Sequence, residues 1–252
     1  MADAFDKLSL NHSDNDSKAY NKLLKSAERR TIKLKDSGPQ VKVVTHELFV
    51  PLTKDELAEV SHAFSAENKK KILVSHENSS IDIRGEVLQC LKPGSWLNDE
   101  VINLYLELLK ERENREPKKF LKCHFFNTFF YKKIFVPIHK DIHWCLAVIN
   151  KKDRKFQYLD SLRGRDGKVL NALANYFVEE VRDKSRQDID ISSWEREHVE
   201  DLPAQKNGFD CGMFMLKYID FYSRGLSLSF GQEHMRYFRS RTAKEILRLR
   251  AD

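Results

Sequence analysis

Hydrophobic positions alternate with polar ones in short runs across the middle of the chain. Residues 143–149 and 155–161 are rich in β-branched and aromatic side chains, and the polar stretch 150–154 separates them. This pattern predicts an antiparallel hairpin with a short turn. Residues 134–138 predict a strand leading into the hairpin, and residues 194–199 predict another strand.

Other segments have the three-to-four-residue spacing of amphipathic helices. One such segment follows the capping sequence 98–100 and has apolar residues at Val101, Leu104, Tyr105 and Leu108. Thr53 and Glu56 form a capping box that predicts a helix extending to about residue 64. Further helices are predicted over 167–181, from Cys211 to just before Gly225, and over 232–249. Because strands and helices mix without a regular βαβ repeat, the predicted fold class is α+β.

The first part of the chain lacks this patterning. Residues 1–44 are polar and turn-rich apart from a helix-prone patch at 18–30, so we expect a weakly ordered extension there. The tighter pattern of residues 45–252 predicts one folded domain, which we expect to be monomeric.

Composition narrows the class of protein further. The 252 residues carry a net charge of +6, but basic and acidic residues are interspersed and no nucleic-acid-binding motif accompanies them. We find neither a secretory signal nor an apolar run of membrane-spanning length, so we expect an intracellular protein of the nucleus or cytoplasm, without nucleic-acid or membrane partners. The four cysteines form no Cys-x-x-Cys pair, which argues for a reducing compartment, no structural metal and no cofactor.

One cysteine stands where a predicted helix begins. At a helix N-terminus the backbone N–H groups and the helix dipole favour a thiolate, so Cys211 is a candidate nucleophile. Gln205, six positions upstream, is a candidate donor to an oxyanion. The alternatives are a buried cysteine that packs as a small apolar group and a solvated glutamine in a polar loop.

The predicted hairpin supplies a candidate base. His143 opens its first strand and Asp160 closes its second, which places both side chains at one edge of the sheet. An imidazole oriented by a carboxylate and next to a thiol is the arrangement of acyl-transfer enzymes. Taken alone, His143 could be a surface histidine and Asp160 a turn residue.

The order of these motifs resembles one family. Four segments are similar, in the same order, to the motifs of the SUMO-specific, or sentrin-type, cysteine proteases. They are Gly94-Ser95-Trp96-Leu97-Asn98-Asp99, His143-Trp144, Leu159-Asp160-Ser161 and Gln205-x-Asn-x-x-Asp-Cys211-Gly. The resemblance implies a papain-like cysteine protease fold with a central mixed or antiparallel sheet flanked by helices. It implies that His143 is the general base, Asp160 its orienter, Cys211 the nucleophile and Gln205 the oxyanion donor.

The resemblance also implies a substrate. Trp96 and Trp144 would flank a narrow tunnel for the Gly-Gly tail of SUMO, and Asp99 would lie in the surface that binds the modifier. The alternatives are core packing for the tryptophans and helix capping for Asp99. One face of the aromatic run 125–131 would also touch the modifier.

These expectations define an activity. The chain would be a thiol protease or isopeptidase that cleaves after the C-terminal Gly-Gly of SUMO, with SUMO and SUMO-conjugated proteins as partners. It would mature SUMO precursors and release SUMO from target lysines. The alternatives are a protease for another ubiquitin-like modifier, an acyltransferase with the same residues, and a modifier-binding module without catalysis.

Overall fold

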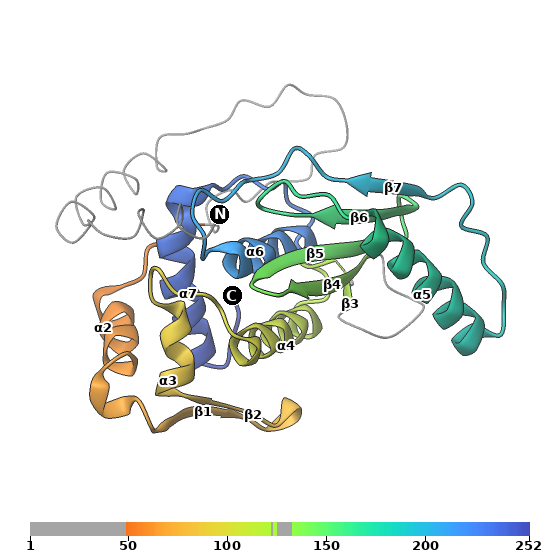
Figure 1. The fold of residues 1–252 in the computed structure, drawn as a ribbon. Helices are drawn as coiled ribbons and strands as arrows, with labels where there is room; N and C mark the ends of the chain where they lie inside the picture. The colour runs from red at the N-terminus through yellow and green to blue at the C-terminus, as the bar shows by residue number, and fades with distance from the viewer. Residues whose placement is uncertain (1–48, 122, 125–132) are drawn as a thin grey trace. The chain divides into compact units, whose positions relative to one another are not determined.

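The computed structural model describes residues 49–121, 123–124 and 133–252 (Figure 1). The predicted extension 1–44 and the aromatic run 125–131 therefore lie outside the described residues. The chain divides into two compact units, residues 1–57 and 58–252, and every candidate site residue belongs to the second unit. No helix in the described part of the chain has the length and apolar character needed to cross a membrane.

The predicted elements form, with some changes of boundary. The helices are α2 (Lys54–Ala63), α3 (Gly85–Leu88), α4 (Asp99–Arg115), α5 (Gly167–Ser185), α6 (Cys211–Ser223) and α7 (Met235–Leu247). The strands are β1 (Ile72–His76), β2 (Ile81–Arg84), β3 (Cys123–His124), β4 (Lys133–Lys140), β5 (His143–Asn150), β6 (Lys155–Leu159) and β7 (Glu195–His198). The Thr53 and Glu56 capping box before α2 is confirmed, since each side chain bonds the other residue's backbone N–H. The β1–β2 hairpin is an element that the hydrophobic pattern did not predict.

A mixed sheet of order β3-β4-β5-β6-β7 is the framework of the second unit. The predicted hairpin is confirmed: β5 and β6 pair antiparallel, with Asn150 opposite Lys155 and Leu146 opposite Leu159. Strand β4 pairs antiparallel with β5, whereas β3–β4 and β6–β7 are parallel. The α+β class is thus confirmed, and the sheet combines both strand directions.

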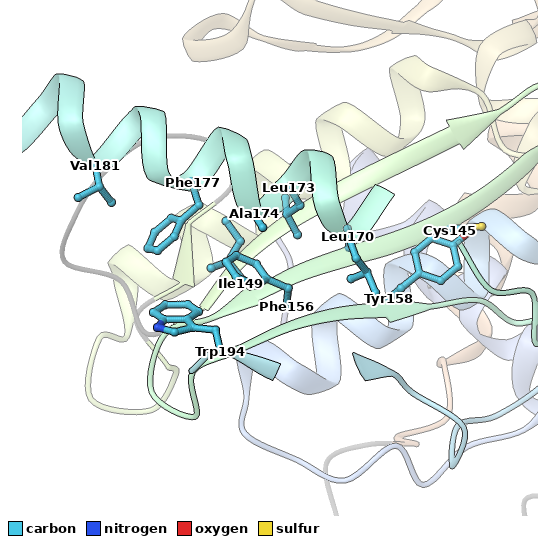
Figure 2. Close-up of a cluster of buried hydrophobic side chains, with 11 residues drawn as sticks. Cys145, Ile149, Phe156, Tyr158, Leu170, Leu173, Ala174, Phe177, Val181 and Trp194 are labelled. Carbon is cyan, nitrogen blue, oxygen red and sulfur yellow. The ribbon is translucent and has the colours of Figure 1, made fainter. Parts of the chain in front are cut away.

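Helix α5 packs on one face of this sheet (Figure 2). Its apolar side, including Leu170 and Phe177, meets inward-facing residues of β5 and β6. Phe156 lies 6.0 Å from the Phe177 ring and 5.1 Å from the Trp194 ring, measured between centroids. Because side chains alternate along a strand, Cys145 lies on this α5 face while Leu146 faces the other way.

Helix α6 packs against β5, and helices α4 and α7 pack against α6 in turn. Almost every residue of α6 is buried, which fixes the helix firmly in the second unit. Its first residue, Cys211, is thereby held beside the end of the sheet where His143 begins β5. The fold therefore brings together two motifs that are 68 residues apart in the sequence numbering.

Candidate active site

Helix α6 presents Cys211 at its first turn, as the sequence predicts. The thiol accepts hydrogen bonds from the backbone N–H groups of Trp144 and Gly212 and from the His143 side chain. A Cβ atom at Gly212 would lie 3.0 Å from the Leu97 side chain, so this close packing of the helix start favours glycine. The thiol sits among donors that stabilise negative charge.

The predicted pairing of His143 with Asp160 is present. His143 Nε2 donates to Asp160 Oδ1 at 2.7 Å, and the Leu162 N–H donates to the same oxygen at 2.8 Å. Asp160 follows β6 directly, and its carboxylate lies against the backbone of Gly164, where an added Cβ would clash with Oδ2. A tight turn after β6 thus holds the orienting carboxylate.

The pKa values of His143, Cys211 and Asp160 are shifted in directions that favour the charged form of each group. The hydrogen bond to Asp160, followed by those to the thiols, raises the pKa of His143 to about 12. Burial raises the pKa of Cys211, but the bonds from His143 and the two backbone N–H groups outweigh burial and leave this pKa below its usual value. Burial likewise raises the pKa of Asp160, and the donors His143 and Leu162 more than offset it. These shifts favour a thiolate beside an imidazolium and a carboxylate over the neutral thiol and imidazole.

A second thiol lies close to this pair. Cys145 Sγ, a His143 ring nitrogen and an Asp160 oxygen all lie within 4.8 Å of one another, which is the one grouping in the described residues that could hold a metal ion. The nitrogen and the oxygen already bond each other. Cys145 is the third residue of β5 and lies within the core next to the Tyr158 ring (Figure 2), whereas Cys211 begins a helix. The helix start therefore favours Cys211 as the nucleophile.

Gln205 is buried and held at both ends of its side-chain amide. Ser161 Oγ donates to Gln205 Oε1 at 2.6 Å, and Gln205 Nε2 donates to the Asn207 carbonyl oxygen at 2.6 Å. One N–H of the amide is engaged, and the second N–H is left for an oxyanion. The solvated alternative for Gln205 is wrong, because only 7% of the residue is exposed.

The two tryptophans differ in environment. Trp96 is 54% exposed, which excludes a core role, and its indole N–H donates to the Gly208 carbonyl oxygen at 2.6 Å, three residues before Cys211. Trp144 is 9% exposed and stacks on His139, with ring centroids 4.2 Å apart. The exposed indole is free to meet a ligand on one face, while Trp144 also contributes its backbone N–H to the thiol.

Asp99 is exposed in the first turn of α4, but the capping side chain is that of Asn98, whose Oδ1 accepts from the Val101 N–H at 3.0 Å. Asp99 is therefore available to a partner, and its role in binding a modifier stays a prediction. Three residues near the site were missed by sequence reasoning: Ser161, Asn207 and Arg239. Ser161 and Asn207 lie inside recognised motifs, but nothing in the sequence pairs Arg239 with them.

The geometry of thiol, imidazole, carboxylate and side-chain amide is that of the cysteine-protease class. The chain matches the Ulp1 protease family, C-terminal catalytic domain, over residues 95–135 and 132–251. It belongs to this family. It is 55% identical over 98% of its length to the ubiquitin-like-specific protease ESD4 of Arabidopsis thaliana, and 35% identical over 78% to the human sentrin-specific protease 2.

The chain covers only part of these relatives, spanning 62% of the first and 37% of the second. Among solved structures, it is similar to the C-terminal Ulp1 protease domain crystallised with SMT3, the yeast orthologue of SUMO. The TM-score is 0.66 at 23% identity, covering 80% of this chain and 97% of that chain. A Chaetomium thermophilum Ulp1-like SUMO protease catalytic domain gives a TM-score of 0.67 at 22% identity, with coverages of 81% and 92%. These neighbours confirm the fold.

Proposed function

We propose that the chain is a thiol protease and isopeptidase that cleaves after the C-terminal Gly-Gly of SUMO. The observation that carries the proposal is the His143 imidazole, which bonds both the Asp160 carboxylate and the Cys211 thiol. Relatives named as ubiquitin-like-specific and sentrin-specific proteases support the substrate class.

The proposed mechanism uses each group in turn. The Cys211 thiolate attacks the carbonyl carbon of the second glycine, and the negative charge moves onto the carbonyl oxygen. The free N–H of the Gln205 amide and the Cys211 backbone N–H stabilise this oxyanion. The His143 imidazolium then protonates the departing amine, which leaves the second glycine bound to Cys211 as a thioester. A water molecule that passes a proton to the neutral imidazole hydrolyses this thioester, which releases the carboxylic acid of the modifier and restores the thiolate and the imidazolium.

The surroundings of the site suit an extended glycine tail. Trp96, Ile142 and Leu162 are exposed apolar side chains, and each lies within a few residues of a site residue or bonds the loop that precedes Cys211. Binding sites for small or extended ligands are lined mostly by apolar and aromatic side chains around a few polar groups, and these three side chains would supply apolar contacts next to the reactive groups. We propose SUMO and SUMO-conjugated proteins as the partners and a monomer as the working form.

The test is a panel of fluorogenic C-terminal amides of SUMO, ubiquitin and another ubiquitin-like modifier, incubated with the full chain. We expect release from SUMO at least 100-fold faster than from the others, and none from the Cys211→Ser variant. Release from another modifier's amide that is as fast as release from the SUMO amide would show that the enzyme also accepts that modifier and is not specific for SUMO. Tight binding of SUMO without any release, unaffected by alkylation of Cys211, would indicate a binding module.

A further inference from the structure

A single buried guanidinium on α7 links the two loops that meet at the nucleophile. Arg239 is 1% exposed, and its Nε and Nη2 donate to Asp210 Oδ1 at 2.9 and 2.7 Å. Its remaining bonds go to backbone carbonyl oxygens of Cys90, Lys92, Ser95 and Phe209, at 2.9, 3.1, 2.7 and 3.2 Å. The residue before Cys211 and the segment leading to Trp96 are therefore tied to the same side chain.

The carboxylate that Arg239 holds continues toward the oxyanion donor. Asp210 Oδ2 accepts from Asn207 Nδ2 at 2.7 Å and from Gln232 Nε2 at 2.6 Å. Asn207 Oδ1 accepts from the Asp210 N–H at 3.1 Å, and the Asn207 carbonyl oxygen accepts from Gln205 Nε2 at 2.6 Å. An unbroken series of hydrogen bonds thus runs from α7 through Asp210 and Asn207 to the Gln205 amide.

The contacts require an arginine in particular. The planar guanidinium offers five N–H donors in a fixed fork, and here they reach one carboxylate oxygen and four carbonyl oxygens. A lysine would keep the charge opposite Asp210 but has three donors at one point, so it cannot hold both loops.

A second buried pair offers a comparison within the same molecule. Arg112 is also 1% exposed and donates to Asp220 Oδ1 at 2.8 Å. Its other bonds go to Ser223 Oγ and to the Asp252 carbonyl oxygen, near the end of α6 and at the C-terminus. Arg112 matches Arg239 in burial and pairing but contacts no residue of the site.

We propose that Arg239 is a positioning residue of the hydrolase: through Asp210 and Asn207 it fixes the Gln205 amide and the start of α6 where the oxyanion forms. The inference rests on the proposed function for its reaction and goes beyond it in naming the residue that assembles the oxyanion donors. Arg239 touches no substrate, so its loss acts on turnover through the loops.

The test compares Arg239→Lys with Arg112→Lys in the full chain, well below the melting temperature of each variant. Three rates are measured: release from the SUMO C-terminal amide, hydrolysis of p-nitrophenyl acetate, and alkylation of Cys211 by iodoacetamide. Only the first two pass through an oxyanion. Hydrolysis of the simple ester also reports on the site when no modifier is bound, which separates this proposal from the choice of modifier.

For Arg239→Lys we expect both hydrolytic rates to fall about tenfold or more, with alkylation within threefold of wild type, since one lost oxyanion donor is worth about 10²–10³ in rate. Arg112→Lys should stay within twofold on all three. Hydrolysis unchanged by Arg239→Lys, or lowered equally by Arg112→Lys, would overturn the proposal. Failure of the wild type on SUMO but not on the ester would overturn the proposed substrate alone.

A second variant covers the case in which Arg239→Lys does not fold. Asn207→Ala breaks the same series of bonds at a half-buried loop residue and keeps the buried Arg239–Asp210 pair intact. We expect the same signature, with hydrolysis lowered and alkylation retained. Wild-type hydrolysis in a folded Asn207→Ala variant would show that the series of bonds does not position Gln205, and the proposal would be wrong.

Discussion

Ser161 and Gln205 hold each other by two hydrogen bonds across 44 positions of sequence. Ser161 Oγ donates to Gln205 Oε1 at 2.6 Å, and the Gln205 backbone N–H donates to the Ser161 carbonyl oxygen at 2.9 Å. Because Ser161 follows Asp160 directly, the turn that fixes the orienting carboxylate also fixes the proposed oxyanion donor. The proposed base and the proposed oxyanion site are therefore positioned by one segment of backbone.

Removal of this hydroxyl gives the first prediction. Ser161→Ala leaves Gln205 Oε1 buried without its donor, at a cost of about 1–3 kcal/mol, and frees the amide to rotate. We expect turnover of the SUMO amide to fall about tenfold, measured by steady-state kinetics. Ser185→Ala removes a comparable hydroxyl that bonds Val181 within α5, and it should leave turnover unchanged. Equal loss in both variants would point to general destabilisation.

The second prediction separates the thiols. Cys211→Ser should abolish single-turnover cleavage while retaining binding of a SUMO conjugate in a pull-down, because a hydroxyl is far harder to ionise than a thiol. Cys90→Ser should keep substantial activity, since burial raises the pKa of that thiol to about 11. Cys145→Ser should also keep substantial activity if folded. Cleavage by Cys211→Ser would contradict the mechanism.

The third prediction concerns pH. The pKa of Cys211 lies below its usual value and that of His143 is about 12, so the thiolate–imidazolium pair should persist to a lower pH than an ordinary cysteine thiolate does. Alkylation by iodoacetamide should be lost only as pH falls through the lowered thiol pKa. Asp160→Asn removes the charge that raises the His143 pKa, so the imidazolium stabilises the thiolate less. The acid limb of the alkylation profile of this variant should therefore move to higher pH, and its turnover at pH 7 should fall at least 100-fold.

A change at an exposed aspartate serves as the control for that experiment. Asp190 also has a lowered pKa, from hydrogen bonds to Ser192, but it bonds no residue of the site. Asp190→Asn should leave the pH profile of alkylation unchanged. An unchanged profile in Asp160→Asn would mean that the carboxylate does not set the charge of His143.

Gly164 provides the fourth prediction. A methyl group there would clash with Asp160 Oδ2, so Gly164→Ala should push the carboxylate away from His143. We expect about a tenfold fall in turnover and a shift of the alkylation profile to higher pH. The matched control is Gly167→Ala, three residues away, where an added Cβ meets nothing within 4 Å. If the two alanine variants behave alike, the turn does not position Asp160.

The fifth prediction contrasts the tryptophans. Trp96→Ala removes an exposed ring, so the melting temperature should change little while KM for the SUMO amide rises about tenfold, with ester hydrolysis retained. Trp144→Ala removes a buried ring stacked on His139 and should cost about 3 kcal/mol of unfolding free energy, read from denaturant titration. Tyr176→Ala, at an exposed ring on α5, should change neither quantity. An unchanged KM for Trp96→Ala would remove that residue from the substrate site.

The proximity of His143 and Asp160 could be predicted from the sequence because it depends on the pairing of two neighbouring strands. Two strands of alternating pattern, joined by a short polar turn, can pair in few registers, and the observed register places the end of β6 beside the start of β5. His143 and Asp160 therefore had to lie close together. The helix start at Cys211 is similarly local, since the helical pattern begins there.

Other features depended on pairing at long range. The parallel pairing of β6 with β7 follows a connection that includes α5, and the sequence pattern does not fix the direction of a strand after such a connection. The β1–β2 hairpin was missed because β1 opens on a continuous apolar run, Ile72 to Val74, and because β2 alternates over only four residues, Ile81 to Arg84. Its strands are stabilised by contacts with α4 and α7 rather than by their own pattern.

The sequence by itself determined the candidate residues His143, Asp160, Cys211 and Gln205, because their order and spacing form recognisable motifs. Tertiary structure decided how they meet: α6 places Cys211 against β5, and Arg239 on α7 joins two loops that are distant in sequence. A buried arginine on a predicted helix looks like a surface residue in a hydrophobic pattern. Only the packing of α7 gives it a carboxylate and four carbonyl oxygens to bind, since those acceptors converge through the fold and not along the chain.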